Sequence, residues 1–171
     1  MYDKLIPLLG KSIEDKEIKT LLEEWKIEYP KSIYCTPNYP VLKGKIEKHC
    51  IRLYFGMGGN SRYLKPITSS RANSYIAQFT MIEFTKKRTD SIPFGVTFAM
   101  TPDELTAILG APKVTDFAGK TTTWRKNYTK KHELIVTDSI FPDGTAVRSM
   151  NLTFIYVPDL NTLEEYEKAG L

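Results

Sequence analysis

The sequence predicts an α+β fold in which short helices pack on one face of antiparallel sheet. Two segments have the capping residues and apolar spacing of amphipathic helices, and each precedes segments in which apolar and polar residues alternate. This helix-then-strands order occurs twice along the chain. We therefore expect two tandem helix-plus-sheet units, residues 1–91 and 92–171, which together can form one shared domain.

Composition and charge narrow the classes of function. The 171 residues are 42% hydrophobic and 26% charged, which is ordinary for a soluble globular protein. Residues 1–91 carry 16 basic and 10 acidic side chains, whereas residues 92–171 carry 8 and 10. A basic first unit favours a partner with an acidic surface. The chain has no basic helix, aromatic RNA-binding motif or zinc-finger spacing, so we expect no nucleic-acid partner.

The cysteines and the apolar runs indicate where the protein resides. Cys35 and Cys50 are too few for a disulfide framework in a chain of this size, so we expect reduced thiols. The apolar run at the start is too short for a signal peptide, and no run reaches the length of a membrane helix. These features favour a cytoplasmic protein without a membrane partner.

The first predicted helix covers residues 12–26. Ser12 followed by Asp15 is typical of a helix start, and Pro30 prevents continuation beyond the far end. The spacing i, i+3, i+4, i+7 gives the helix one apolar stripe, formed by Ile18, Leu21, Leu22 and Trp25.

The first unit then continues as strands and loops. Residues 32–35 are expected to add a short edge strand, and residues 48–55 alternate in the manner of a half-buried strand. Residues 57–73 form a long polar connection, and connections of this length are often functional. Residues 75–85, rich in Ile, Phe, Thr and Tyr, predict a second strand.

The second predicted helix, residues 101–109, has the clearest local signals in the chain. Thr101 and Glu104 have the spacing of a capping box, and Pro102 stands at the first helical position. Gly110 is suited to the positive φ that ends a helix. The predicted core stripe is Leu105, Ile108 and Leu109.

Three strands and a terminal helix are predicted after this helix. The strands cover residues 120–128, 132–140 and 146–157, and a short terminal helix is expected at residues 160–168. Alternation in the last strand predicts an antiparallel meander with one packed and one open face. We expect both tryptophans in the core, Trp25 because it lies on the apolar stripe of its helix and Trp124 because it is central in a strand.

Residues 94–112, with their capped helix and Gly-x-Pro ending, resemble a repeat signature found in BamE/SmpA-like and beta-lactamase-inhibitor-protein-like repeats. Together with Trp124 and residues 144–152, they also resemble bacterial proteins encoded beside polymorphic toxins. This resemblance implies a cytosolic immunity protein that neutralises a cognate toxin by occluding its active or substrate-binding surface. A BamE-like lipoprotein needs an export signal and a lipid-bearing cysteine, which are not seen. The alternative is a BamE-like scaffold or assembly factor, or a self-associating binding module.

The residue patterns do not indicate an enzyme. His49 and His132 have no acid or cysteine at metal-ligand spacing, and the glycines at residues 56–59 lack the lysine of a phosphate-binding loop. We therefore predict no catalytic, cofactor-binding or metal-binding residues. An uncharacterised enzyme remains a third possibility, because facing carboxylates across a cleft have no sequence signature.

The open sheet face and the long polar connection are the predicted places for a partner. Arginine and tyrosine are the side chains most expected at the centre of a protein interface. We expect the free protein to be a monomer or a weak homodimer. The predicted partner-binding residues are Arg52, Tyr54, Arg62, Tyr63, Arg125, Asn127, Ser149 and Asn151.

Overall fold

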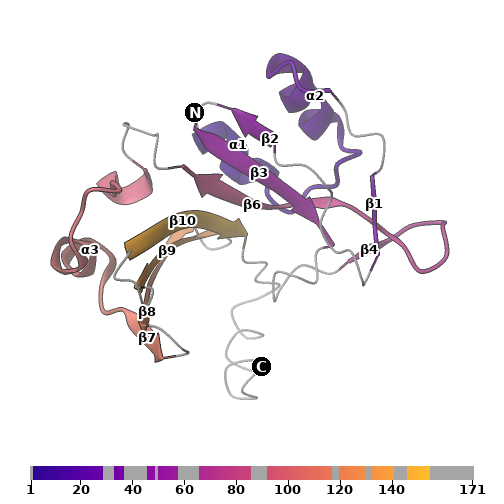
Figure 1. Cartoon of the computed structure of the whole chain (residues 1–171). Coiled ribbons are helices and arrows are strands. Elements are labelled where there is room, and N and C mark those ends of the chain that lie inside the picture. The colour runs from indigo at the N-terminus through magenta and orange to yellow at the C-terminus, as the bar shows by residue number, and fades with distance from the viewer. Residues whose placement is uncertain are drawn as a thin grey trace.

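The computed structural model describes residues 2–28, 33–36, 46–48, 50–57, 66–85, 92–116, 120–129, 132–140 and 146–154, and confirms an α+β fold (Figure 1). The described helices are α1 (Tyr2–Leu5), α2 (Lys16–Glu24) and α3 (Pro102–Leu109), with 3₁₀ turns η1 (Ile6–Leu8) and η3 (Pro93–Gly95). The strands are β1 (Tyr34–Cys35), β2 (Ile46–Lys48), β3 (Ile51–Gly56), β4 (Ile67–Thr68), β5 (Tyr75–Ile76), β6 (Gln78–Phe84), β7 (Lys113–Asp116), β8 (Lys120–Thr129), β9 (His132–Ile140) and β10 (Ala146–Phe154).

The described strands form two sheets, and the described pairings are all antiparallel. The larger sheet has the order β2-β3-β6-β10-β9-β8-β7, and the smaller has the order β1-β5-β4. Strand β6 pairs with β10, so strands from residues 1–91 and from residues 92–171 belong to one seven-stranded sheet. The division into two units stays a prediction about domain organisation.

The helix predicted at residues 101–109 is confirmed as α3, together with its capping box. The backbone N–H of Glu104 donates to Thr101 Oγ1 at 3.3 Å, and the N–H of Thr101 donates to Glu104 Oε2 at 2.7 Å. The helix ends before Gly110, whose φ of 93° lies in the region that favours glycine. Leu105 and Leu109 are buried, as the apolar stripe predicted.

The helix predicted at residues 12–26 is shorter, because α2 begins at Lys16. Ser12 is not its N-cap: its backbone forms a β-bridge with Gln78, and its N–H donates to Asp15 Oδ2 at 2.9 Å. Asp15 occupies the N-cap position instead. The pattern Ser-x-x-Asp therefore marks a turn that leads into the helix. The predicted apolar stripe is confirmed as buried: Ile18, Leu21, Leu22 and Trp25.

The C-terminus of α2 has the hydrogen-bond pattern of a Schellman motif. Lys26 follows the C-cap with a φ of 53°, and its N–H donates to the carbonyl of Glu23 at 2.9 Å. The N–H of Ile27 donates to the carbonyl of Leu22 at 2.8 Å. The chain therefore leaves the helix in a left-handed residue that is not glycine.

The segment predicted as one strand at residues 48–55 is part of a hairpin. Lys48 pairs with Ile51 in an antiparallel ladder, so β2 and β3 are the two arms of this hairpin. Cys50, immediately before β3, has a φ of 59°, a left-handed conformation that glycine adopts with less strain. The alternation predicted for Ile51, Leu53 and Phe55 is confirmed, because these side chains are buried and their neighbours are half-buried.

The predicted strand at residues 75–85 is divided between the two sheets at Ala77. Strand β5 joins the smaller sheet and β6 joins the larger one. Ala77 forms its hydrogen bonds with other segments: its N–H donates to the Ile33 carbonyl at 2.8 Å, and its carbonyl accepts from the Ile13 N–H at 2.9 Å. The edge strand expected at residues 32–35 is the two-residue β1 beside β5.

Several elements differ from the prediction in extent. Strands β8 and β9 are confirmed, and β10 extends to Phe154, with residues 155–157 and the helix predicted at 160–168 outside the described residues. No element was predicted at α1, η1, β4 or β7. The segment at α1 and η1 contributes Leu5, Ile6 and Leu9 to the core.

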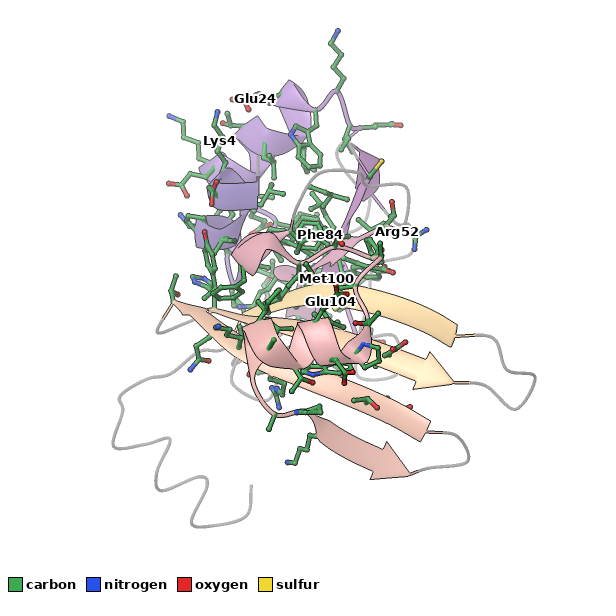
Figure 2. All side chains as sticks on the ribbon, turned by 90° about the vertical axis from the view of Figure 1, so that its left-hand side faces the viewer. Lys4, Glu24, Arg52, Phe84, Met100 and Glu104 are labelled. Carbon is green, nitrogen blue, oxygen red and sulfur yellow. The ribbon has the colours of Figure 1, made fainter. Side chains whose placement is uncertain are left out.

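The core lies against one face of the seven-stranded sheet. Trp124 of β8, Val136 of β9, Phe84 of β6 and Ile51 of β3 are at most 1% exposed and belong to one cluster with side chains of α2 and α3. Helix α3 lies across the strands of the second unit (Figure 2), and Trp124 Nε1 donates to Thr106 Oγ1 at 3.0 Å. The prediction that both helices cover one sheet face stays a prediction. In the described part of the chain, no helix is long and apolar enough to cross a membrane.

Candidate partner-binding face of the seven-stranded sheet

The face of the sheet opposite the core carries a row of polar side chains. Residues directly opposite each other in an antiparallel ladder point to the same face, and neighbours along a strand point to opposite faces. Since Trp124, Val136 and Phe84 face the core, their strand neighbours face away from it. We call this set, which is mostly polar but includes the apolar Met81 and Ile135, the polar face: Arg52, Tyr54, Met81, Glu83, Thr123, Arg125, Asn127, Glu133, Ile135 and Thr137.

Glu83 is held by two side chains from the neighbouring strand β3. Arg52 pairs directly with Glu83 in the ladder, and its Nη1 donates to Glu83 Oε1 at 3.2 Å. Tyr54 donates its hydroxyl hydrogen to Glu83 Oε2. Both carboxylate oxygens are therefore occupied, and the three side chains hold one another in fixed orientations.

The environment of Tyr54 keeps its hydroxyl protonated. The pKa of Tyr54 is raised to about 12, chiefly by burial and also by the hydrogen bond to Glu83 and the negative charge of that carboxylate. The charge of Arg52 opposes them in part. At neutral pH, Tyr54 is therefore a hydrogen-bond donor fixed on the carboxylate.

A second ion pair lies on strands β8 and β9. Arg125 donates from Nε at 3.0 Å and from Nη2 at 2.6 Å, and both bonds reach Glu133 Oε2. Glu133 stands diagonally across the ladder, because Arg125 itself is paired with Ile135. The Glu133 side chain is 10% exposed and that of Arg125 is 48% exposed. The carboxylate is thus buried beneath a guanidinium that faces solvent.

The structure brings four predicted partner-binding residues onto this face: Arg52, Tyr54, Arg125 and Asn127. Asn127 is exposed and pairs with Glu133. The backbone of Ser149 pairs with Thr137, and that of Asn151 pairs with Ile135 and Glu83, so both occupy register positions in the same rows. Their side chains, and residues Arg62 and Tyr63, lie outside the described part.

Glu83 and Glu133 were missed as members of the site. Glu83 lies between Ile82 and Phe84, and Glu133 precedes the apolar run Leu134–Val136; an acid in such a strand is rarely buried unless it is paired. That signal identifies a carboxylate in need of a cation. It does not identify the arginine, because the cross-strand register is set by distant segments.

The described histidine and the two cysteines are not members of the polar face. Thr129 Oγ1 and His132 Nδ1 are hydrogen-bonded at 2.6 Å where β8 ends and β9 begins, and His49 lies outside the described residues. Cys35 and Cys50 are free thiols, and burial raises the pKa of Cys35. Among the residues that the structure describes, no group of three or more His, Cys, Asp or Glu side chains is placed to hold a metal ion.

Comparison of the chain with models of protein families, with curated proteins and with solved structures finds no match. The relation to immunity-type repeats therefore remains a resemblance carried by residues 94–112, Trp124 and residues 144–152.

Proposed function

We propose that the chain is a cytoplasmic immunity protein that binds a cognate bacterial toxin through the polar face. Neutralisation follows from occlusion of the toxin's active or substrate-binding surface. The observation that carries the proposal is the pair of ion-paired arginines, Arg52 and Arg125, which stand with Tyr54 on one side of a continuous sheet. Arginine and tyrosine are the side chains that most often dominate the energy of protein interfaces.

The ion pairs favour binding because they orient the arginines in advance. An interface loses about 0.5–1.5 kcal/mol for each flexible side chain that it must immobilise. Arg125 is already held at two of its nitrogens by Glu133, and Tyr54 is held by Glu83. A partner that docks on this face therefore loses less entropy than one that docks on mobile surface arginines.

The proposal also assigns a role to the carboxylates that is not catalytic. Both oxygens of Glu83 accept hydrogen bonds, and Glu133 accepts two from one guanidinium. A general base needs a lone pair directed at its substrate, whereas the hydrogen bonds of both carboxylates engage side chains of this chain. Glu83 and Glu133 are better suited to positioning their neighbours.

A self-associating binding module is the second candidate. Within the described strands, β7 ends the order of the seven-stranded sheet and pairs only with β8. A strand edge of this kind can pair with another chain. Sedimentation or light scattering over a range of protein concentrations tests this candidate, because it requires a mass that rises with concentration.

The experiment for the immunity function uses the gene beside the one that encodes this chain. Its product should be a large protein with a toxic C-terminal domain, and co-expression of the present chain should restore growth. Arg52→Glu and Arg125→Glu should each abolish rescue and weaken binding of the purified toxin domain. Lys4→Glu, on α1, serves as the matched control because it also reverses one exposed positive charge (Figure 2).

Two results would contradict the proposal. In the first, the wild-type chain neither binds the toxin domain nor restores growth. In the second, both arginine variants fold and protect as well as the wild-type chain does. Circular dichroism and thermal unfolding of each variant establish that a lost interaction is not a lost fold.

A further inference from the structure

The described charges of the polar face cancel in pairs. Arg52 is matched by Glu83 and Arg125 by Glu133, and each carboxylate is less exposed than its arginine: 18% against 29% in the first pair and 10% against 48% in the second. Residues 1–91 carry an excess of six positive charges, but this excess does not come from the described side chains of the polar face. The described part of the face therefore offers donors without a net positive charge.

Arg125 is the most accessible of these donors. A guanidinium has five N–H groups, and Glu133 takes one from Nε and one from Nη2. The remaining N–H groups, on Nη1 and Nη2, have no acceptor among the described residues. With nearly half of the side chain exposed, these groups can donate to a molecule that docks on the sheet.

We infer, on the basis of the proposed function, that the toxin presents neutral oxygen acceptors to Arg125, such as backbone carbonyl or side-chain amide oxygens. The positive charge of Arg125 is already compensated by Glu133. A carboxylate of the partner would approach Glu133 as well as Arg125, and the repulsion between the two acids would offset much of its attraction. A neutral oxygen accepts the same hydrogen bonds without that repulsion.

This inference differs from the expectation drawn from charge along the chain, which favoured an acidic patch on the partner. The two expectations give different dependences on salt. Ionic strength screens the attraction between oppositely charged surfaces, whereas it has little effect on hydrogen bonds to neutral acceptors. Binding of the purified toxin domain should be measured by surface plasmon resonance from low to high sodium chloride concentration.

A neutral epitope predicts a dissociation constant that changes by no more than about twofold across this range, whereas an acidic patch predicts a loss of about tenfold or more. Arg125→Ala should weaken binding by about tenfold at every salt concentration. Lys4→Ala, which removes an exposed positive charge on α1, should leave binding unchanged.

Glu133→Gln gives a test that depends on sign. The substitution uncovers the charge of Arg125, so an acidic epitope would bind this variant more tightly and with greater dependence on salt. A neutral epitope would bind it more weakly, because the neutral amide of glutamine orients the Arg125 guanidinium less firmly than the Glu133 carboxylate does. Glu24→Gln, on the exposed surface of α2, changes the net charge equally and should leave binding as it is (Figure 2).

The outcomes separate this inference from the function on which it depends. If the wild-type chain does not bind the toxin domain at all, the proposed function and the inference both fail. If it binds, the inference alone fails when salt weakens binding by tenfold, when Glu133→Gln tightens it, or when Arg125→Ala leaves it unchanged.

Discussion

We predict that Thr106→Val weakens the attachment of α3 to the seven-stranded sheet. The Thr106 hydroxyl donates to the Pro102 carbonyl at 2.8 Å and accepts from Trp124 Nε1 at 3.0 Å. Trp124 is 1% exposed, so its indole N–H has little access to water. Valine has almost the shape and helix propensity of threonine but no hydroxyl, so the substitution removes the acceptor and preserves the packing.

The free energy of unfolding should fall by about 1–2 kcal/mol, which is the cost of leaving a buried donor without its partner. The lost bond to Pro102 contributes little, because a hydroxyl that bonds to the preceding turn of its own helix does not stabilise that helix. In a chain of this length, the change corresponds to a fall of about 2–8 °C in melting temperature.

A double-mutant cycle isolates the hydrogen bond. Thr106→Val should cost less than about 0.5 kcal/mol in a Trp124→Phe background, which gives a coupling energy of about 1 kcal/mol. Urea unfolding followed by far-ultraviolet circular dichroism is the appropriate assay, because the substitution removes a fluorescent residue. Thr106→Ser is the control that keeps the hydroxyl. A coupling energy below about 0.3 kcal/mol would refute the view that this bond fastens α3 to β8.

Four other predictions concern the polar face and the backbone. Glu83→Gln should lower the pKa of Tyr54 from about 12 towards 10.0, because the Glu83 carboxylate raises it. The titration of Tyr54 is followed by ultraviolet absorbance as the difference from Tyr54→Phe, and an unchanged titration in Glu83→Gln would contradict the prediction. The pKa of Tyr54 is higher in the folded state than in the unfolded state, so its stabilising contribution is complete below pH 10.0 and is lost as the pH rises towards about 12. Between these pH values, the free energy of unfolding should fall more for the wild-type protein than for Tyr54→Phe. Lys26→Gly should raise the free energy of unfolding by about 0.5–1 kcal/mol, because Lys26 has a φ of 53° at the end of α2; equal or lower stability in urea would show that the left-handed residue is not strained. Cys50→Gly, at a φ of 59° between β2 and β3, should raise the free energy of unfolding by a similar amount. A lower melting temperature would indicate that the packing of the thiol stabilises the protein more than the positive φ destabilises it.

The elements that could be predicted from sequence are those whose determinants are local. Helix α3 is specified by Thr101, Glu104 and Gly110 within one short segment: the first two cap each other, and the N–H of Gly110 donates to the Thr106 carbonyl of the same helix. The division of β5 from β6 at Ala77 was not predictable, because it depends on backbone bonds to Ile13 and Ile33 from distant parts of the chain. Alternation identifies an extended segment without stating which sheet each half will join.

The same distinction applies to the candidate site. Period-two alternation predicted that Arg52 and Tyr54 share one face of their strand, and likewise Arg125 and Asn127 of theirs. The pairing of Arg52 with Glu83 depends on the register between β3 and β6, which no local pattern specifies. The sequence therefore indicated which side chains face away from the core, but not the carboxylates that fix their orientation.

Strand β10 lies between β6 and β9, although it is the last described strand in the chain. During synthesis on the ribosome, β6 emerges well before the neighbour that covers one of its edges in the finished sheet. Until residues 146–154 leave the exit tunnel, that edge is open to pairing with other nascent chains. Co-translational chaperones that shield an open strand should therefore improve the yield of this protein more than its modest length suggests.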